Sequence, residues 1–79
     1  MTPEEKKAEI EALLFMATEP IKIKEIKEAT ALGTKEIRQY LAELEEEYAV
    51  PARGIELVEF NDGYIFQTKA KYQETIKEH

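Results

Sequence analysis

The hydrophobic period of this sequence changes once along its 79 residues, and that change restricts the possible folds more than any other feature. Up to Tyr48, apolar residues recur at the spacings of three and four that are typical of helices. Pro51 and Gly54 then interrupt the pattern, and the residues that follow alternate with a period of two, as strands do. A chain this short has room for one modest core. We therefore predict helices and strands that share a single core.

The first helix is predicted to begin at Pro3 and to run to about Ala17. Thr2 is suited to cap it, and Glu5 to complete a capping box. Its core stripe follows at helical spacing: Ile10, Leu13, Leu14 and Ala17. At about 100° per residue, Phe15 lies about 140° from Ile10, and Met16 lies about 120° from it on the other side. Neither side chain belongs to the core stripe.

Two further helices are predicted, separated by a short turn. Pro20 ends the first helix because the residue before a proline is displaced from the helical region. A short helix follows, with apolar positions at Ile23, Ile26 and Ala29 and an end near residues 30–32. Gly33, directly after it, is suited to a left-handed helix terminus. Thr34 is suited to cap a third helix over residues 35–48. Two helices joined by a short turn that contains glycine form a helix-turn-helix.

A β-hairpin is the strongest single motif in the sequence. Residues 55–60 and 64–68 are rich in β-branched and aromatic side chains, and Asn61-Asp62-Gly63 joins them. Residues 21–23 are available as a third short strand.

These elements predict the α+β fold class and, within it, a winged helix. Its parts are a three-helix helix-turn-helix core and a small antiparallel β-hairpin as the wing. We expect one winged-helix domain over residues 1–79, in which residues 69–79 form a terminal helix or a tail.

The charge distribution argues against DNA as a partner. The formal net charge is -6, and the predicted third helix carries Lys35 and Arg38 against five glutamates. The turn of the wing contains no Lys or Arg. Winged helices that contact DNA place the third helix in the major groove and use cations of the wing on the backbone, and phosphate contacts supply much of the affinity. We expect no direct sequence-specific DNA binding.

The amino-acid composition also argues against catalysis. The sequence has no Ser and no Cys, and its one histidine, His79, is the last residue. The glutamates lie mostly at outward helix positions, and the three glycines are isolated from one another. We therefore predict that the protein is not an enzyme, with no catalytic residues, no cofactor and no metal site.

No apolar run approaches the roughly 18 residues of a membrane span, and no signal-peptide core follows the charged N-terminus. These features predict a cytoplasmic protein that does not bind membranes.

The sequence has more large apolar side chains than so small a core can accommodate. They suggest a contact patch of a kind that monomers seldom leave exposed, and small cores gain stability from oligomerisation. A homodimer is the simplest candidate. The candidate contact residues are Phe15, Met16, Tyr40, Phe60 and Tyr64.

Three segments resemble the amino-terminal winged helix of the segregation and condensation protein B family, ScpB. Residues 10–21 read I-E-A-L-L-F-M-A-T-E-P-I, which is similar to the family's I-E-A-L-L-F helix ending at a proline. Residues 53–68 read R-G-I-E-L-V-E-F-N-D-G-Y-I-F-Q-T, similar to its hairpin. Residues 41–48, L-A-E-L-E-E-E-Y, resemble the helix between them.

The resemblance implies a non-enzymatic subunit of the SMC/kleisin complex that condenses and segregates chromosomes. It implies homodimerisation, binding to the kleisin ScpA and, through ScpA, association with the SMC ATPase and the nucleoid. Members of the family normally carry a second winged helix, so residues 1–79 would be the amino-terminal half of a two-domain protein.

Two other functions stay open from the sequence. One is a winged-helix transcriptional regulator that binds DNA through an unconventional surface, for which the only basic cluster is Lys22, Lys24 and Lys27. The other is a hydrolase that depends on carboxylates.

Overall fold

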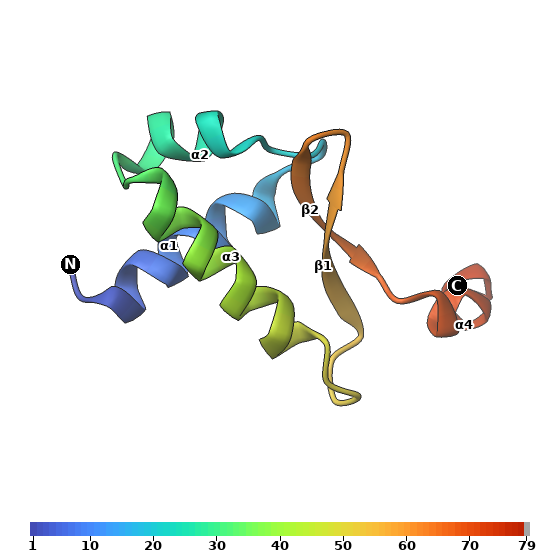
Figure 1. The fold of residues 1–79 in the computed structure, drawn as a ribbon. Helices are drawn as coiled ribbons and strands as arrows, with labels where there is room; N and C mark the ends of the chain where they lie inside the picture. Colours follow the sequence, from blue (N-terminus) through green and yellow to red (C-terminus); the bar gives the residue numbers. More distant parts are fainter. Residues whose placement is uncertain (79) are drawn as a thin grey trace.

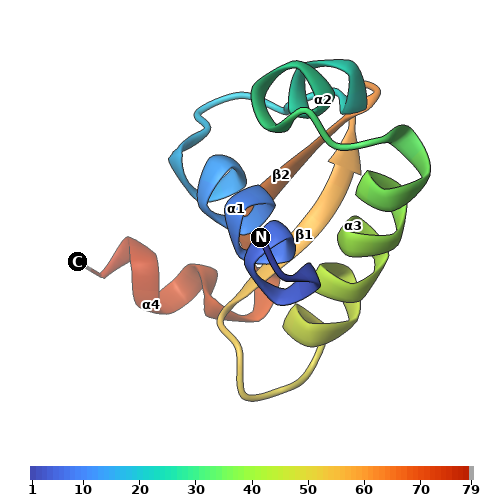
Figure 2. The same cartoon turned by 90° about the vertical axis from the view of Figure 1, so that its left-hand side faces the viewer.

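The computed structural model describes residues 1–78. Its elements follow in the order α1 (Pro3–Met16), α2 (Ile23–Thr30), α3 (Thr34–Tyr48), β1 (Ile55–Phe60), β2 (Gly63–Thr68), η1 (Ala70–Tyr72) and α4 (Gln73–Lys77). Three helices pack together, α3 also packs on β1 and α1 on β2, and α4 extends away from this body (Figure 1). In the side view of Figure 2, α4 projects to the lower left and α3 lies on the right, with α1 drawn between them. The winged-helix prediction is confirmed.

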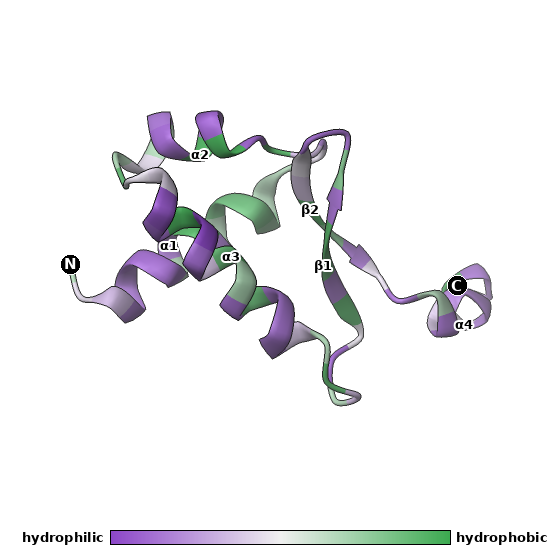
Figure 3. Ribbon diagram, viewed as in Figure 1, coloured by the Kyte–Doolittle hydropathy of each residue, from purple (hydrophilic) through white to green (hydrophobic). Residues whose placement is uncertain are grey.

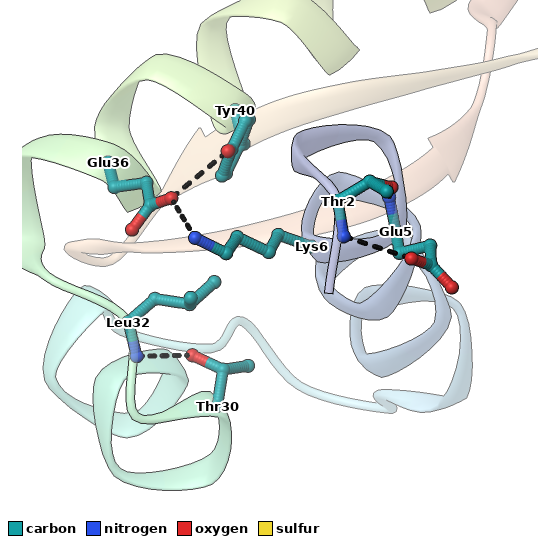
Figure 4. Close-up of polar contacts among 7 residues, drawn as sticks. All are labelled: Thr2, Glu5, Lys6, Thr30, Leu32, Glu36 and Tyr40. Atoms are coloured by element: carbon teal, nitrogen blue, oxygen red, sulfur yellow. Dashed lines mark hydrogen bonds and ion pairs between the residues drawn. The ribbon is translucent and has the colours of Figure 1, made fainter.

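α1 begins where the sequence predicts. The Glu5 amide donates to the Thr2 hydroxyl (3.1 Å), and the Thr2 amide donates to the Glu5 carboxylate (2.9 Å; Figure 4). This reciprocal pair satisfies two amides that a helix start otherwise leaves without a partner. The helix ends at Met16, one residue before the predicted end, and Ala17 follows it in an extended conformation.

The turn between α2 and α3 differs from the prediction. Ala31, and not Gly33, adopts the left-handed conformation (φ 62°) that ends α2. Gly33 is extended and immediately precedes α3, and Thr34 is the first residue of that helix. The Thr30 hydroxyl accepts a hydrogen bond from the Leu32 amide (3.3 Å; Figure 4), which gives this turn a local side-chain support.

The wing is a two-residue hairpin. Phe60 pairs with Gly63, and both residues between them have positive φ, 51° for Asn61 and 62° for Asp62. Two consecutive left-handed residues form the type I′ turn, whose twist matches that of the strands. Gly63 belongs to β2, so this strand starts one residue earlier than predicted.

The third strand is reduced to a single bridge. Ile21 and Tyr64 exchange two backbone hydrogen bonds, of 2.8 and 2.9 Å. The prediction of a strand over residues 21–23 is wrong beyond that residue, because Ile23 already begins α2.

The core lies between the three helices and the inner face of the hairpin. Its buried side chains are Ile10, Leu14, Ile26, Leu32, Ile37, Tyr40, Leu41, Leu44, Leu57 and Tyr64. Every helix of the trio and both strands contribute, so the wing is part of the core and not an appendage.

Lysines of α1 reach across to carboxylates of α3. Lys6 Nζ lies 3.0 Å from Glu36 Oε2, which also accepts a hydrogen bond from the Tyr40 hydroxyl (3.1 Å; Figure 4). Lys7 pairs with Glu43 (3.3 Å) and with Glu47. These contacts fix the side of α1 that faces α3.

The terminal segment is a short helix, as one of the two predicted forms. η1 and α4 have their main contacts with each other. Where the segment leaves β2, Lys69 is tied to the body by its amide, which donates to the Gly54 carbonyl (3.0 Å). His79, the last residue of the predicted tail, lies outside the described residues.

Candidate interaction surfaces

α1 carries apolar residues on both of its faces. Ile10 and Leu14 are buried in the core, whereas Phe15 is 72% exposed and Met16 is 75% exposed. Two small residues, Ala8 and Ala12, are also exposed. The colouring of Figure 3 shows the C-terminal half of this helix as hydrophobic. We call Ala8, Ala12, Phe15 and Met16 the outer face of α1. Large apolar side chains grouped on the side of a helix that faces away from its core suggest a contact surface.

A groove of about 330 Å³ opens between α1, the end of α3 and the base of the hairpin. We call it the α1 groove; its lining residues are Glu11, Ala12, Phe15, Tyr48, Ile55 and Phe66. The rings of Tyr48 and Phe66 meet edge to face, with centroids 4.8 Å apart.

Polar groups hold Tyr48 at the edge of this groove. Its hydroxyl donates a hydrogen bond to Glu11, and the Arg53 guanidinium lies 5.6 Å from the centre of its ring. The hydrogen bond to Glu11 and partial burial together raise the pKa of the Tyr48 hydroxyl.

A second groove, of about 430 Å³, lies on the outer face of the wing. Val58 and Ile65 pair across the two strands, and Phe60 is 59% exposed beside them. We call these three residues with Pro20 the wing face. The outer face of a half-buried antiparallel sheet is usually polar, so this apolar face is a second candidate contact.

The structure places the five predicted contact residues in two groups. Phe15 and Met16 lie on α1 and Phe60 lies on the wing, all three exposed. Tyr40 and Tyr64 are instead buried, with 6% and 8% exposure. They fill the core where a small chain lacks other large side chains, so they offer no surface to a partner. Burial raises the pKa of both hydroxyls.

Several lining residues were not among the candidates. Val58 and Ile65 alternate along their strands with the residues of the inner face, so they point to the outer face of the hairpin. This alternation could have identified them from the sequence. Tyr48 and Ile55 gave no such signal, because the groove forms only when α3 and the hairpin are brought against α1.

The charge of α3 is divided between two sides of the helix. Glu36, Glu43 and Glu47 face the lysines of α1. The exposed charged residues that make no ion pair with α1 are Lys35, Arg38, Glu45 and Glu46. The free face of α3 is therefore close to neutral, and the net charge of the helix comes from carboxylates engaged within the domain.

Within residues 1–78 no group of acidic or histidine side chains is placed to hold a metal ion. Among these residues, no helix has both the length and the apolar character needed to cross a membrane.

The family described as "Segregation and condensation complex subunit ScpB" matches residues 8–79. The chain belongs to the ScpB family. The family resemblance seen in the sequence is thereby confirmed.

Full-length ScpB proteins show the same relationship and a difference in length. The Alkaliphilus oremlandii protein is 38% identical over 77 residues, which are 98% of this chain and 42% of that protein. The Bacillus subtilis protein is 33% identical over 72 residues, 90% of this chain and 36% of that protein. The chain thus spans less than half the length of these relatives.

Two solved ScpB structures share the fold. The crystal structure of a dimer of the ScpB N-terminal domain complexed with an ScpA peptide has a TM-score of 0.90 and 28% identity, and the match covers 95% of this chain and 94% of that one. ScpB from Mycobacterium tuberculosis has a TM-score of 0.91 at 22% identity, over 99% of this chain and 49% of that one.

Proposed function

We propose that this domain is a non-enzymatic interaction module of the SMC/kleisin complex that condenses and segregates chromosomes, and that it acts by homodimerisation and by binding the kleisin ScpA. The observation that carries the proposal is the exposure of Phe15, Met16 and Phe60 on two apolar faces of a small, otherwise well-packed domain. The similar ScpB N-terminal domain, which forms a dimer with a bound ScpA peptide, supports it.

The proposed contact residues are those three exposed side chains. Burial of one large apolar side chain contributes about 1.5–3 kcal/mol, so a partner that covers all three gains a substantial part of a stable interface. A monomer gains nothing from holding them in water.

We also propose that residues 1–79 correspond to the amino-terminal domain of a two-domain subunit. The extent of the match supports this: the chain covers nearly all of an isolated ScpB N-terminal domain and less than half of complete relatives.

Light scattering and co-purification test the proposed function together. The chain is expected to be a dimer at high micromolar concentration and to co-purify with ScpA from the same source. A double variant, Phe15→Glu with Phe60→Glu, is expected to lose both properties while its circular dichroism spectrum is unchanged. A wild-type chain that stays monomeric and does not retain ScpA would contradict the proposal.

A further inference from the structure

The two sides of α1 differ in how their charges are used. Both lysines of the helix, Lys6 and Lys7, are engaged by carboxylates of α3. Residues three or four apart are neighbours on a helix surface. Glu4 is therefore a neighbour of Ala8, and Glu11 is a neighbour of both Ala8 and Phe15. The outer face of α1 is therefore edged by carboxylates, because the cations of the helix are directed inward.

The α1 groove adjoins this face. Phe15 and Ala12 belong to both, and the edge-to-face pair of Tyr48 and Phe66 lines the opposite wall. A concave apolar site of a few hundred Å³ is suited to hold a large anchoring side chain. Ala8 and Ala12 are small enough for another helix to approach α1 closely.

A second copy of this chain does not complement the outer face of α1. Two such faces packed together would bring the Glu4 and Glu11 carboxylates of both copies into one apolar contact, where like charges cost the most. The wing groove also has one carboxylate among its lining residues, that of Glu59, and its Gln67 side chain donates a hydrogen bond to Glu56 (3.0 Å).

We propose that the outer face of α1, with the α1 groove, accepts a basic amphipathic helix of a partner protein. This inference rests on the proposed function and specifies which surface the partner occupies and what its segment is made of. The partner helix lies along Ala8 and Ala12 and inserts a large apolar side chain between Phe15 and the Tyr48–Phe66 pair. Its Lys or Arg residues face Glu4 and Glu11. Such docking is a common mode of peptide recognition.

Two synthetic peptides test the chemistry. Both carry leucine at the same helical spacing; one has lysine at the remaining positions and the other has glutamate. Measured by fluorescence anisotropy, the lysine peptide is expected to bind the full chain at least about tenfold more tightly, a difference of about 1.4 kcal/mol. Glu11→Gln, which keeps a hydrogen-bond acceptor for Tyr48, is expected to reduce the salt dependence of that binding.

Matched variants on the two faces test the location. Phe15→Ser is expected to lower the affinity for the lysine peptide about tenfold. The same variant is expected to lose co-purification with ScpA while it stays dimeric. Phe60→Ser, an equivalent truncation on the wing face, is expected to leave peptide binding unchanged.

Three outcomes would overturn this inference. The first is equal binding of the two peptides, and the second is an unchanged affinity in Phe15→Ser. The third is conversion of Phe15→Ser to a monomer, which would make a second copy the occupant. ScpA that still binds Phe15→Ser but not Phe60→Ser would exclude the α1 face and leave the proposed function intact. ScpA that fails to bind even the wild-type chain would count against the proposed function.

Discussion

At the scale of single residues, Gly63 is fixed by a close approach and not by backbone conformation. A Cβ atom at this position would lie 2.9 Å from Cβ of Pro20 and 3.1 Å from the backbone carbon of Ile21. Neither neighbour is a flexible side chain, and the bridge between Ile21 and Tyr64 holds the two segments together. The wing can close against this segment only because Gly63 has no side chain.

We therefore expect Gly63→Ala to destabilise the domain by about 1–3 kcal/mol, as overpacking in a well-packed site does. Urea denaturation would measure the change. Gly54→Ala is the matched control, because no atom lies within 4 Å of a Cβ atom there; it should be neutral or stabilise by up to about 1 kcal/mol. Equal stability of the two variants would show that the wing closes differently.

One residue between α2 and α3 could not be predicted correctly from the sequence. Gly33 was the natural choice for the left-handed terminus of α2, but Ala31 takes that conformation. An alanine in the left-handed region costs roughly 1–2 kcal/mol, and packing of Leu32 into the core outweighs the cost. The conformational preferences of single residues do not include such a gain from packing in the core.

At the scale of elements, α1 is attached to α3 by ionised groups as well as by the core. The hydrogen bond from Lys6, followed by that from Tyr40, lowers the pKa of Glu36 below its ordinary value of 4.5. The pKa of Lys6 is raised by the same pair. Both shifts favour the charged forms in the folded chain.

This pairing predicts an acid-dependent loss of stability. Because the folded-state pKa of Glu36 is depressed, its contribution is present above 4.5 and is lost as the pH falls through the folded value. Glu36→Gln should melt at a lower temperature than wild type at neutral pH, and the gap should narrow below 4.5. Glu46→Gln, an exposed glutamate of the same helix, should show no such narrowing. Parallel pH profiles of Glu36→Gln and wild type would contradict the assignment.

The elements themselves were predictable because each has a local signal. Capping, helical spacing and the Asn61-Asp62 turn place α1, α3 and the hairpin within a residue or two of their observed bounds. The contact surfaces were predictable only in part. Phe15 and Met16 could be assigned to an outer face from helix geometry, but Tyr40 and Tyr64 could not be distinguished from surface residues before the packing of the core was known.

At the scale of the whole molecule, the domain has a compact body and one projecting end. Its extents of 41 × 23 × 17 Å are far from spherical, and α4 lies away from the three-helix body (Figure 1). The side chain of Ile76 is 47% exposed on that helix. Few contacts therefore resist its opening.

Hydrogen exchange should distinguish the compact body from the projecting helix α4. Amides of α4 are expected to exchange close to the rate of an unfolded chain, because local opening there breaks few buried contacts. Amides near Leu41 in α3 should exchange only on global unfolding. Mass spectrometry or NMR in deuterated buffer would measure both, and comparable protection of the two helices would show that α4 is docked.

The apolar residues on both faces of α1 also bear on how much of this protein a cell can tolerate. A copy made in excess of the proposed partner keeps Phe15 and Met16 in water, where they can adhere to other exposed apolar surfaces. Such copies become substrates for aggregation and proteolysis. We expect the abundance of the protein to follow that of the partner proposed to cover α1, so that gene dosage is balanced by degradation of the surplus.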